Sequence, residues 1–103
     1  MSLRHVIRAQ QFDRAWIEEF FGLVEEMERV VAAGGSDALR SRIMATLFYQ
    51  PSTRTRLSFE TAMLRHGGHV ISTENAKEFS SASKGESLED TIRVVAGYSD
   101  AVS

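Results

Sequence analysis

The sequence predicts an α/β protein: a three-layer parallel sheet flanked by helices and incomplete at its C-terminal end. Short apolar runs of strand character, at 43–49 and 69–73, alternate with segments whose apolar residues recur at helical spacing. Strands that alternate with helices build a parallel sheet through right-handed crossovers. The sequence contains no internal repeat.

The first predicted element is a long amphipathic helix. Asp13 is a suitable N-cap, and Gly34-Gly35 supplies the stop. Between them, apolar residues recur at helical spacing at Ile17, Phe20, Val24, Met27 and Val31. A stripe of this kind belongs more often to a hydrophobic core than to a cofactor pocket, so we expect it to be packed.

A strand, a helix and a second strand are predicted next. The apolar run Ile43–Tyr49 has strand character, Thr53–His66 reads as a helix that ends at a pair of glycines, and His69–Thr73 is the second strand. The segment 74–85 is polar and rich in serine, without periodicity.

The last predicted helix begins after Ser87, with Asp90 three residues later as in a capping box. Residues 100–103 resemble the entry to a further strand. A parallel sheet of this size would leave an open hydrophobic edge. We therefore expect residues 1–103 to be the N-terminal portion of a larger domain.

Composition excludes several classes of function. A net charge of −2 over 103 residues is too small to indicate nucleic acid or an anionic membrane as a partner, and no apolar stretch reaches the length of a membrane span. The chain has no cysteine, which excludes disulfides and thiolate metal sites. His5, His66 and His69 lack metal-ligand spacing with acidic residues, so we predict no metal.

A dense set of anion-binding groups lies where the first strand leads into the second helix. Pro51 ends the strand, and Ser52, Thr53, Arg54 and Thr55 follow at once. The start of a helix leaves backbone N–H groups unpaired and carries partial positive charge. Hydroxyls and a guanidinium at the same place add directed donors, which predicts a phosphate site.

The alternative is that Ser52 only caps the helix and that the arginines pair with surface acids. This alternative accounts for Ser52 and for Arg56. It does not account for four consecutive polar donors between a buried strand and an amphipathic helix.

Two blocks of the sequence resemble a known family. Residues Phe48–Glu60 read Phe-Tyr-Gln-Pro-Ser-Thr-Arg-Thr-Arg-Leu-Ser-Phe-Glu, which closely resembles the signature of the aspartate/ornithine carbamoyltransferases. Residues Ser83–Arg93 read Ser-Lys-Gly-Glu-Ser-Leu-Glu-Asp-Thr-Ile-Arg and resemble the aspartate branch of that family. The resemblance covers essentially the whole chain, as the first part of the carbamoyl-phosphate-binding domain, without the aspartate-binding domain.

The resemblance implies transfer of the carbamoyl group from carbamoyl phosphate to the α-amino group of L-aspartate. The products would be N-carbamoyl-L-aspartate and phosphate, at an early step of pyrimidine biosynthesis. The family uses no metal or other cofactor and forms no covalent enzyme intermediate. Catalysis would then depend on positioning and on electrostatic stabilisation.

Matched to the family motif, four residues would bind the phosphate of carbamoyl phosphate: Ser52, Thr53, Arg54 and Thr55. Arg54 would neutralise charge on the leaving phosphate, and Thr55 would stabilise charge on the carbamoyl oxygen. Arg56 and Glu60 also match the motif and would hold the turn in shape.

Ser80 and Lys84 match a mobile loop of the family, which reaches into the active site of a neighbouring subunit in a homotrimer. Lys84 would supply positive charge to the closed site and join the catalytic set. Glu86 would order the loop at the interface through an arginine, with Arg54 as a candidate. Without the resemblance, the segment would read as a solvated linker. Assembly with regulatory chains is a further possibility in this family.

Other parts of the family's site do not occur in this sequence, namely a later arginine and a His-Pro-x-Gln segment. The 103 residues alone are therefore predicted to be inactive. Two alternatives stay open: a carbamoyltransferase with another acceptor such as ornithine, or a non-catalytic anion-binding or oligomerisation module. Absent signals and family habit predict a cytoplasmic location, although a plastid form without its targeting segment would look the same.

Overall fold

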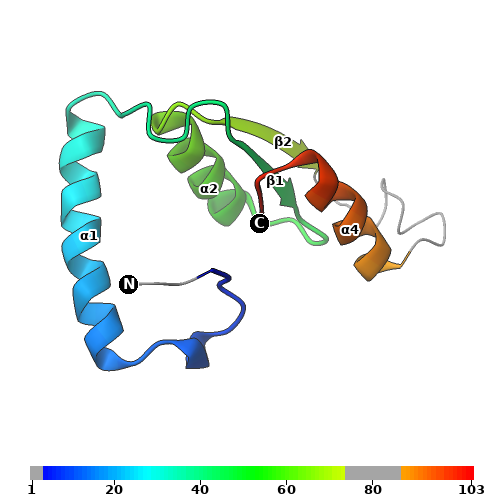
Figure 1. Cartoon of the computed structure of the whole chain (residues 1–103), viewed down its shortest axis with the longest axis horizontal. Helices are drawn as coiled ribbons and strands as arrows, with labels where there is room; N and C mark the ends of the chain where they lie inside the picture. The colour runs from blue at the N-terminus through cyan, green and yellow to red at the C-terminus, as the bar shows by residue number, and fades with distance from the viewer. Residues whose placement is uncertain (1–3, 74–86) are drawn as a thin grey trace. The chain divides into compact units, whose positions relative to one another are not determined.

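The computed structural model describes residues 4–73 and 87–103. The chain divides into two compact units, Met1–Gly34 and Gly35–Ser103 (Figure 1). Among the described residues, no helix is both long enough and apolar enough to cross a membrane.

The N-terminal unit contains a short 3-10 turn, η1 (Ala9–Gln11), and the long helix α1 (Arg14–Ala32). The Asp13 carboxylate accepts a hydrogen bond of 2.8 Å from the Trp16 backbone N–H, which confirms the predicted N-cap. No residue of α1 is buried. Of the apolar stripe predicted to be packed, Met27 is half-buried and the other four residues are exposed. Helical spacing specifies an apolar face but not the partner that covers it.

The second unit is built on a parallel sheet of β1 (Ile43–Leu47), β2 (His69–Thr73) and β3 (Ala101–Val102), in the order β2-β1-β3. The register pairs Ile43 with His69 and Leu47 with Thr73, and β1 is the central strand. The parallel α/β prediction is confirmed. The prediction that the first strand runs to Tyr49 is wrong by two residues, because the chain already leaves the sheet after Leu47 on its way to Pro51.

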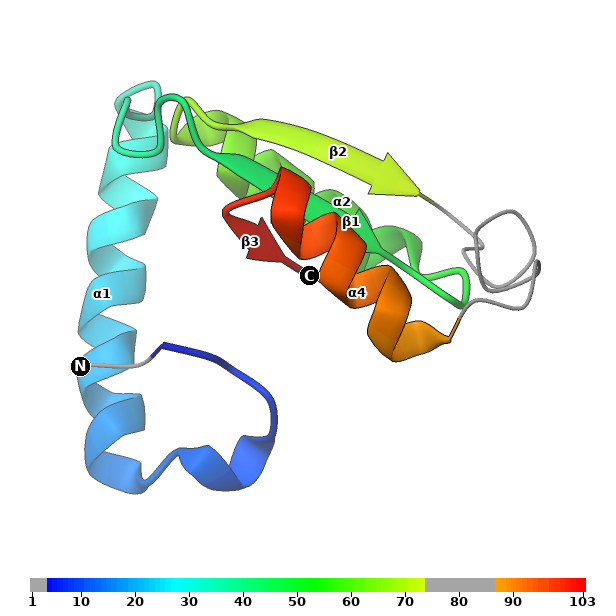
Figure 2. The same ribbon diagram turned by 45° about the vertical axis from the view of Figure 1, so that its right-hand side comes forward.

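Helices α2 (Thr53–Arg65) and α4 (Leu88–Tyr98) lie on opposite faces of this sheet (Figure 2). The first crossover steps from β1 to β2, and the second returns past β1 to β3. Crossovers between parallel strands are right-handed as a rule, so opposite steps place their helices on opposite faces. The Ser87 hydroxyl accepts a hydrogen bond of 3.1 Å from the Asp90 N–H, as predicted for the start of α4.

The core of the second unit lies in and beside the central strand. Its buried apolar residues are Met44, Ala45 and Met63. Thr46 follows Met44 and Ala45 on β1 and is 0% exposed, so a hydroxyl occupies the centre of the sheet. A buried hydroxyl is costly unless it is hydrogen-bonded, so the position of Thr46 requires partners close by.

The segment that leads into β1 packs against the C-terminal end of α2. The Ser36 N–H donates to the Arg65 carbonyl at 2.9 Å, and the Ser36 hydroxyl lies 2.7 Å from Nδ1 of His66. Gly35 has a φ of +96°, and a β-carbon there would collide with the Arg65 carbonyl oxygen. Only glycine fits this close approach without strain.

Candidate functional site

The predicted phosphate turn lies at the carboxyl end of the central strand. β1 ends at Leu47, and α2 begins at Thr53, with Ser52 in the N-cap position. The strands on either side of β1 are reached by crossovers over opposite faces, which makes this edge a topological switch point. Ligands of open α/β sheets bind outside the carboxyl ends of the strands at such points.

The start of α2 leaves hydrogen-bond donors available. The first backbone bond of the helix runs from the Arg56 N–H to the Ser52 carbonyl at 3.0 Å, so the N–H groups of Thr53, Arg54 and Thr55 have no acceptor inside the helix. The Ser52 side chain makes no capping hydrogen bond. The structure therefore does not support the alternative that Ser52 only caps the helix. The Ser52 hydroxyl is available to a ligand instead.

A comparison with α4 shows what is unusual about this helix start. At α4 the Ser87 hydroxyl caps the helix, and Glu89 and Asp90 lie in the first turn. The first turn of α2 contains no acidic residue. The carboxylates of α4 already complement the partial positive charge of that helix, whereas the first turn of α2 supplies no anion of its own.

The side chains at this start add charge of the required sign. Thr53, Arg54 and Thr55 are all exposed, and the Thr55 backbone carbonyl is engaged by the Ser58 hydroxyl at 2.8 Å. Arg54 brings a guanidinium that can donate two parallel hydrogen bonds to one phosphate. The structure thus brings together all four residues that the sequence predicted for the turn.

Arg56 and Glu60, which were expected to hold the turn in shape, take part in a polar cluster under α2. The Arg56 Nε lies 3.4 Å from a Glu60 carboxylate oxygen and donates to the Ser72 hydroxyl at 2.9 Å. The Thr46 hydroxyl lies 2.9 Å from the same Glu60 oxygen and 2.8 Å from the Ser72 hydroxyl. We call these four residues, Thr46, Arg56, Glu60 and Ser72, the α2 anchor.

The electrostatics of the α2 anchor favour an ionised carboxylate. The hydrogen bond from Ser72 does most to hold the pKa of Glu60 below its ordinary value. The Thr46 hydroxyl and the Arg56 charge act in the same direction, and partial burial acts against them. An ionised carboxylate only accepts hydrogen bonds, so it suits a position among three donors.

Sequence reasoning missed Thr46 and Ser72. Thr46 is a hydroxyl inside an otherwise apolar strand, and Ser72 is paired with it in the parallel register. The polar residue within the apolar run was the available signal. Its partner was not visible in the sequence, because the pairing depends on the register of two strands and on the position of α2.

Three other predicted site residues, Ser80, Lys84 and Glu86, lie outside the described residues. Their roles stay predictions. Among residues 4–73 and 87–103, no group of three or more histidine or acidic side chains is arranged to hold a metal ion.

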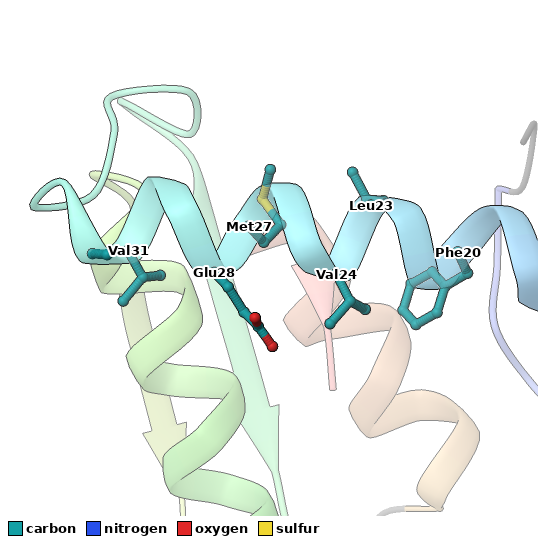
Figure 3. A pocket seen from close by; sticks show the side chains of 7 residues that line it. Phe20, Leu23, Val24, Met27, Glu28 and Val31 are labelled. Atoms are coloured by element: carbon teal, nitrogen blue, oxygen red, sulfur yellow. The ribbon is translucent and has the colours of Figure 1, made fainter.

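A shallow hollow on α1 is the other candidate site (Figure 3). Its lining is apolar apart from one carboxylate, and it consists of Phe20, Leu23, Val24, Met27, Glu28, Val31 and Ala32. Among the residues that line the hollow, Glu28 has no second acid, base or side-chain donor with which to perform chemistry. The hollow is an apolar helix face and not a catalytic site.

The comparisons with known proteins all indicate one family. Residues 4–103 match the model of the aspartate/ornithine carbamoyltransferase carbamoyl-P binding domain. The chain is 58% identical to the chloroplastic aspartate carbamoyltransferase of Oryza sativa subsp. japonica, over 99% of this chain and 30% of that protein.

Two solved structures have the same fold. The catalytic subunit of M. jannaschii aspartate transcarbamoylase matches with a TM-score of 0.88 and 45% identity, over 97% of this chain and 33% of that one. The Trypanosoma cruzi aspartate transcarbamoylase in complex with carbamoyl aspartate and phosphate matches with a TM-score of 0.83 and 43% identity, over 94% of this chain and 31% of that one. The chain therefore spans about a third of the length of these relatives.

Proposed function

Because the chain belongs to the aspartate/ornithine carbamoyltransferase family, we propose that it serves as the N-terminal part of the carbamoyl-phosphate-binding domain of an aspartate carbamoyltransferase. The complete enzyme would transfer the carbamoyl group of carbamoyl phosphate to the amino group of L-aspartate, in pyrimidine biosynthesis. The observation that carries this proposal is the uncapped, acid-free start of α2 at the carboxyl end of the central strand.

The reaction needs little more than positioning and charge stabilisation. The neutral α-amine of aspartate attacks the carbonyl carbon of carbamoyl phosphate, and the bond from that carbon to the phosphate oxygen breaks. The proton that the amine loses passes to the departing phosphate or to water. Negative charge grows first on the carbonyl oxygen and then on the phosphate. Donors fixed in advance at both places lower the barrier.

The residues of the turn are suited to these two tasks. Ser52, Thr53 and the backbone N–H groups of the first turn would bind the phosphate oxygens, and Arg54 would neutralise the charge that develops as phosphate departs. The Thr55 hydroxyl would donate to the carbonyl oxygen. Each role follows from the family motif and from the place of these residues at the open start of α2.

The family resemblance supports further residues from a neighbouring subunit. Ser80 and Lys84 would close over the phosphate in a homotrimer with shared active sites, and Glu86 would order their loop. Subunits carrying Arg54→Ala and subunits carrying Lys84→Ala should then regain activity when they assemble into mixed trimers. Inactive mixed trimers would contradict shared sites.

The central experiment compares two arginines of α2 in the full-length protein. Arg54→Ala should lower kcat for carbamoyl aspartate formation by about 10²-fold or more, as is usual when a donor to developing charge is removed. Arg65→Ala is the matched control, since Arg65 is an exposed arginine in the last turn of the same helix. Equal activity of the two variants would remove Arg54 from the site.

The acceptor and the location are tested separately. Assays with aspartate and with ornithine distinguish the proposed enzyme from a relative with another acceptor, and no turnover with either would favour a non-catalytic module. We propose a cytoplasmic location, and the chloroplastic rice relative supplies the alternative. Cell fractionation distinguishes the two.

A further inference from the structure

We propose that Glu60, together with the hydroxyls of Thr46 and Ser72, is a positioning residue that sets the place of the phosphate turn over the sheet. The proposal rests on the proposed function and concerns residues that do not touch the substrate. It follows from three features of the α2 anchor: the burial of Thr46, the number of elements that the anchor joins, and the scarcity of other contacts that could orient α2.

The first feature is the hydroxyl at the centre of the sheet. Thr46 is 0% exposed and stands beside the buried apolar residues Met44 and Ala45. Valine has nearly the same shape and would avoid the cost of burying a polar group. The hydroxyl is compensated only because Glu60 and Ser72 lie within hydrogen-bond distance, at 2.9 and 2.8 Å.

The second feature is that the anchor joins three elements. Thr46 and Ser72 are paired in the parallel register of β1 and β2, so their side chains project from the same face of the sheet. Glu60 reaches down to that face from α2. A hydroxyl has a single proton, so Thr46 donates to the Glu60 carboxylate or to the Ser72 oxygen, while Ser72 donates to Glu60. One carboxylate thus connects the helix with both strands.

The third feature is that apolar packing orients α2 only weakly. Of the residues of α2, Met63 alone is buried. Apolar contacts are non-directional and permit a helix to slide or rotate, whereas hydrogen bonds have narrow distance and angle requirements. Met63 also lies near the C-terminal end of the helix, so the anchor is the directed contact nearer to the turn.

The distance between the anchor and the turn is short. Glu60 lies seven residues after Thr53, the first residue of α2, which corresponds to about 10 Å along a helix axis. A helix transmits a shift or rotation at one turn to its start as a rigid body. A misplacement of 1 Å at reacting groups can lower a rate by about 10²-fold.

The pKa of Glu60, which lies below its ordinary value because of Ser72, Thr46 and Arg56, supports this role. The carboxylate is ionised at neutral pH and keeps its acceptor capacity.

The test uses the full-length protein and three variants of the anchor. Thr46→Val removes the hydroxyl at constant shape, and Glu60→Gln replaces one acceptor with a donor. Ser72→Ala alters an exposed residue and is therefore expected to spare the fold. Each should raise the KM for carbamoyl phosphate by about 10-fold and weaken the binding of inorganic phosphate by calorimetry. The KM for aspartate at saturating carbamoyl phosphate should change far less.

Two further variants separate positioning from a merely structural contribution. Thr46→Ser keeps the hydroxyl and should restore the KM for carbamoyl phosphate close to that of the wild type, even though it removes a buried methyl. Glu18→Gln alters the exposed carboxylate of another Arg–Glu pair in the same i,i+4 arrangement and should change nothing.

The outcomes distinguish the inference from the proposed function. Active variants with a lowered unfolding temperature and an unchanged KM would overturn the inference and leave the proposed function standing. If Thr46→Val or Glu60→Gln fails to fold, Ser72→Ala decides by the same readout. A wild-type protein that neither turns over carbamoyl phosphate nor binds phosphate would overturn both.

Discussion

Helices α1 and α2 each carry an arginine and a glutamate four residues apart, and the two pairs differ in their surroundings. Arg14 and Glu18 on α1 approach to 2.9 Å, with side chains 92% and 62% exposed. Arg56 and Glu60 on α2 are 3.4 Å apart, with side chains 25% and 14% exposed. The shorter pair lies in water, where screening and side-chain entropy remove most of its value. The longer pair belongs to a hydrogen-bonded cluster, so neighbours and not the pair distance decide its contribution.

The two helices also differ in how they use their apolar residues. α1 has a broad apolar face and no buried residue, whereas α2 buries Met63 against the sheet and Gly68. Amphipathic spacing alone therefore does not report how much a helix contributes to a core. The predictions below test this difference.

The largest expected effect is on core packing. Met63→Ala should destabilise the chain by about 2 to 5 kcal/mol, because it removes a buried side chain and leaves a cavity. Met27→Ala is the matched change on α1 and should cost about 1 kcal/mol or less, since no residue of α1 is buried. Denaturant unfolding followed by circular dichroism measures both. Equal costs would mean that the apolar face of α1 is covered in solution.

The next largest expected effect is on the stability of alanine variants at the two glycines that follow α1. Gly34 and Gly35 both have positive φ, +107° and +96°, so alanine at either position meets backbone strain of about 1 to 2 kcal/mol. Only at Gly35 would the added methyl also meet the Arg65 carbonyl oxygen. Gly35→Ala should therefore cost about 1 to 3 kcal/mol more than Gly34→Ala in unfolding experiments. Equal costs would indicate that the approach of Gly35 to α2 relaxes freely.

The smallest expected effect is a pH dependence. The pKa of Glu60 is lowered in the folded state, chiefly by Ser72. The contribution of Glu60 to stability is therefore complete above its unfolded pKa of about 4.3. That contribution is lost as the pH falls through the lower pKa of the folded state. Unfolding midpoints of the wild type should decline in that acid window, and Glu60→Gln should decline less. The pKa of Asp100 is also lowered, by the Ile43 N–H and by Arg42. Its contribution to stability is therefore lost in the same acid window in both proteins.

Glu18→Gln is the control for this pH dependence, because Glu18 forms the exposed pair of α1. Its midpoints should follow those of the wild type at every pH. A Glu60→Gln curve that is parallel to the wild type would show that the α2 anchor does not bind protons differently in the folded and unfolded states.

Local signals explain which parts of the fold were predictable. The caps at Asp13 and Ser87 and the strand His69–Thr73 were predicted where the structure has them, because a cap or an alternating run depends on neighbours in the chain. The end of β1 was misplaced, since Phe48 and Tyr49 are as apolar as the strand before them. A strand ends where its partner ends, and that depends on pairing.

In the candidate site, too, local features were predictable and features that depend on tertiary contacts were not. Ser52, Thr53, Arg54 and Thr55 were predicted together because hydroxyls and a guanidinium at a helix start have an immediate chemical meaning. The anchor beneath them could be predicted only in part. Glu60 was visible in the motif, while Thr46 and Ser72 belong to strands that meet it through tertiary contacts.

The amino-acid order by itself determined the alternation of strands and helices, the helix starts and the donors at the start of α2, since each depends on residues within a few positions of one another. The tertiary structure alone decided that α2 starts at the edge where the crossovers diverge and that a buried threonine shares a carboxylate with a neighbouring strand. These features require surfaces far apart in the chain to meet, and only the register of the sheet and the packing of the helices settle how they do so.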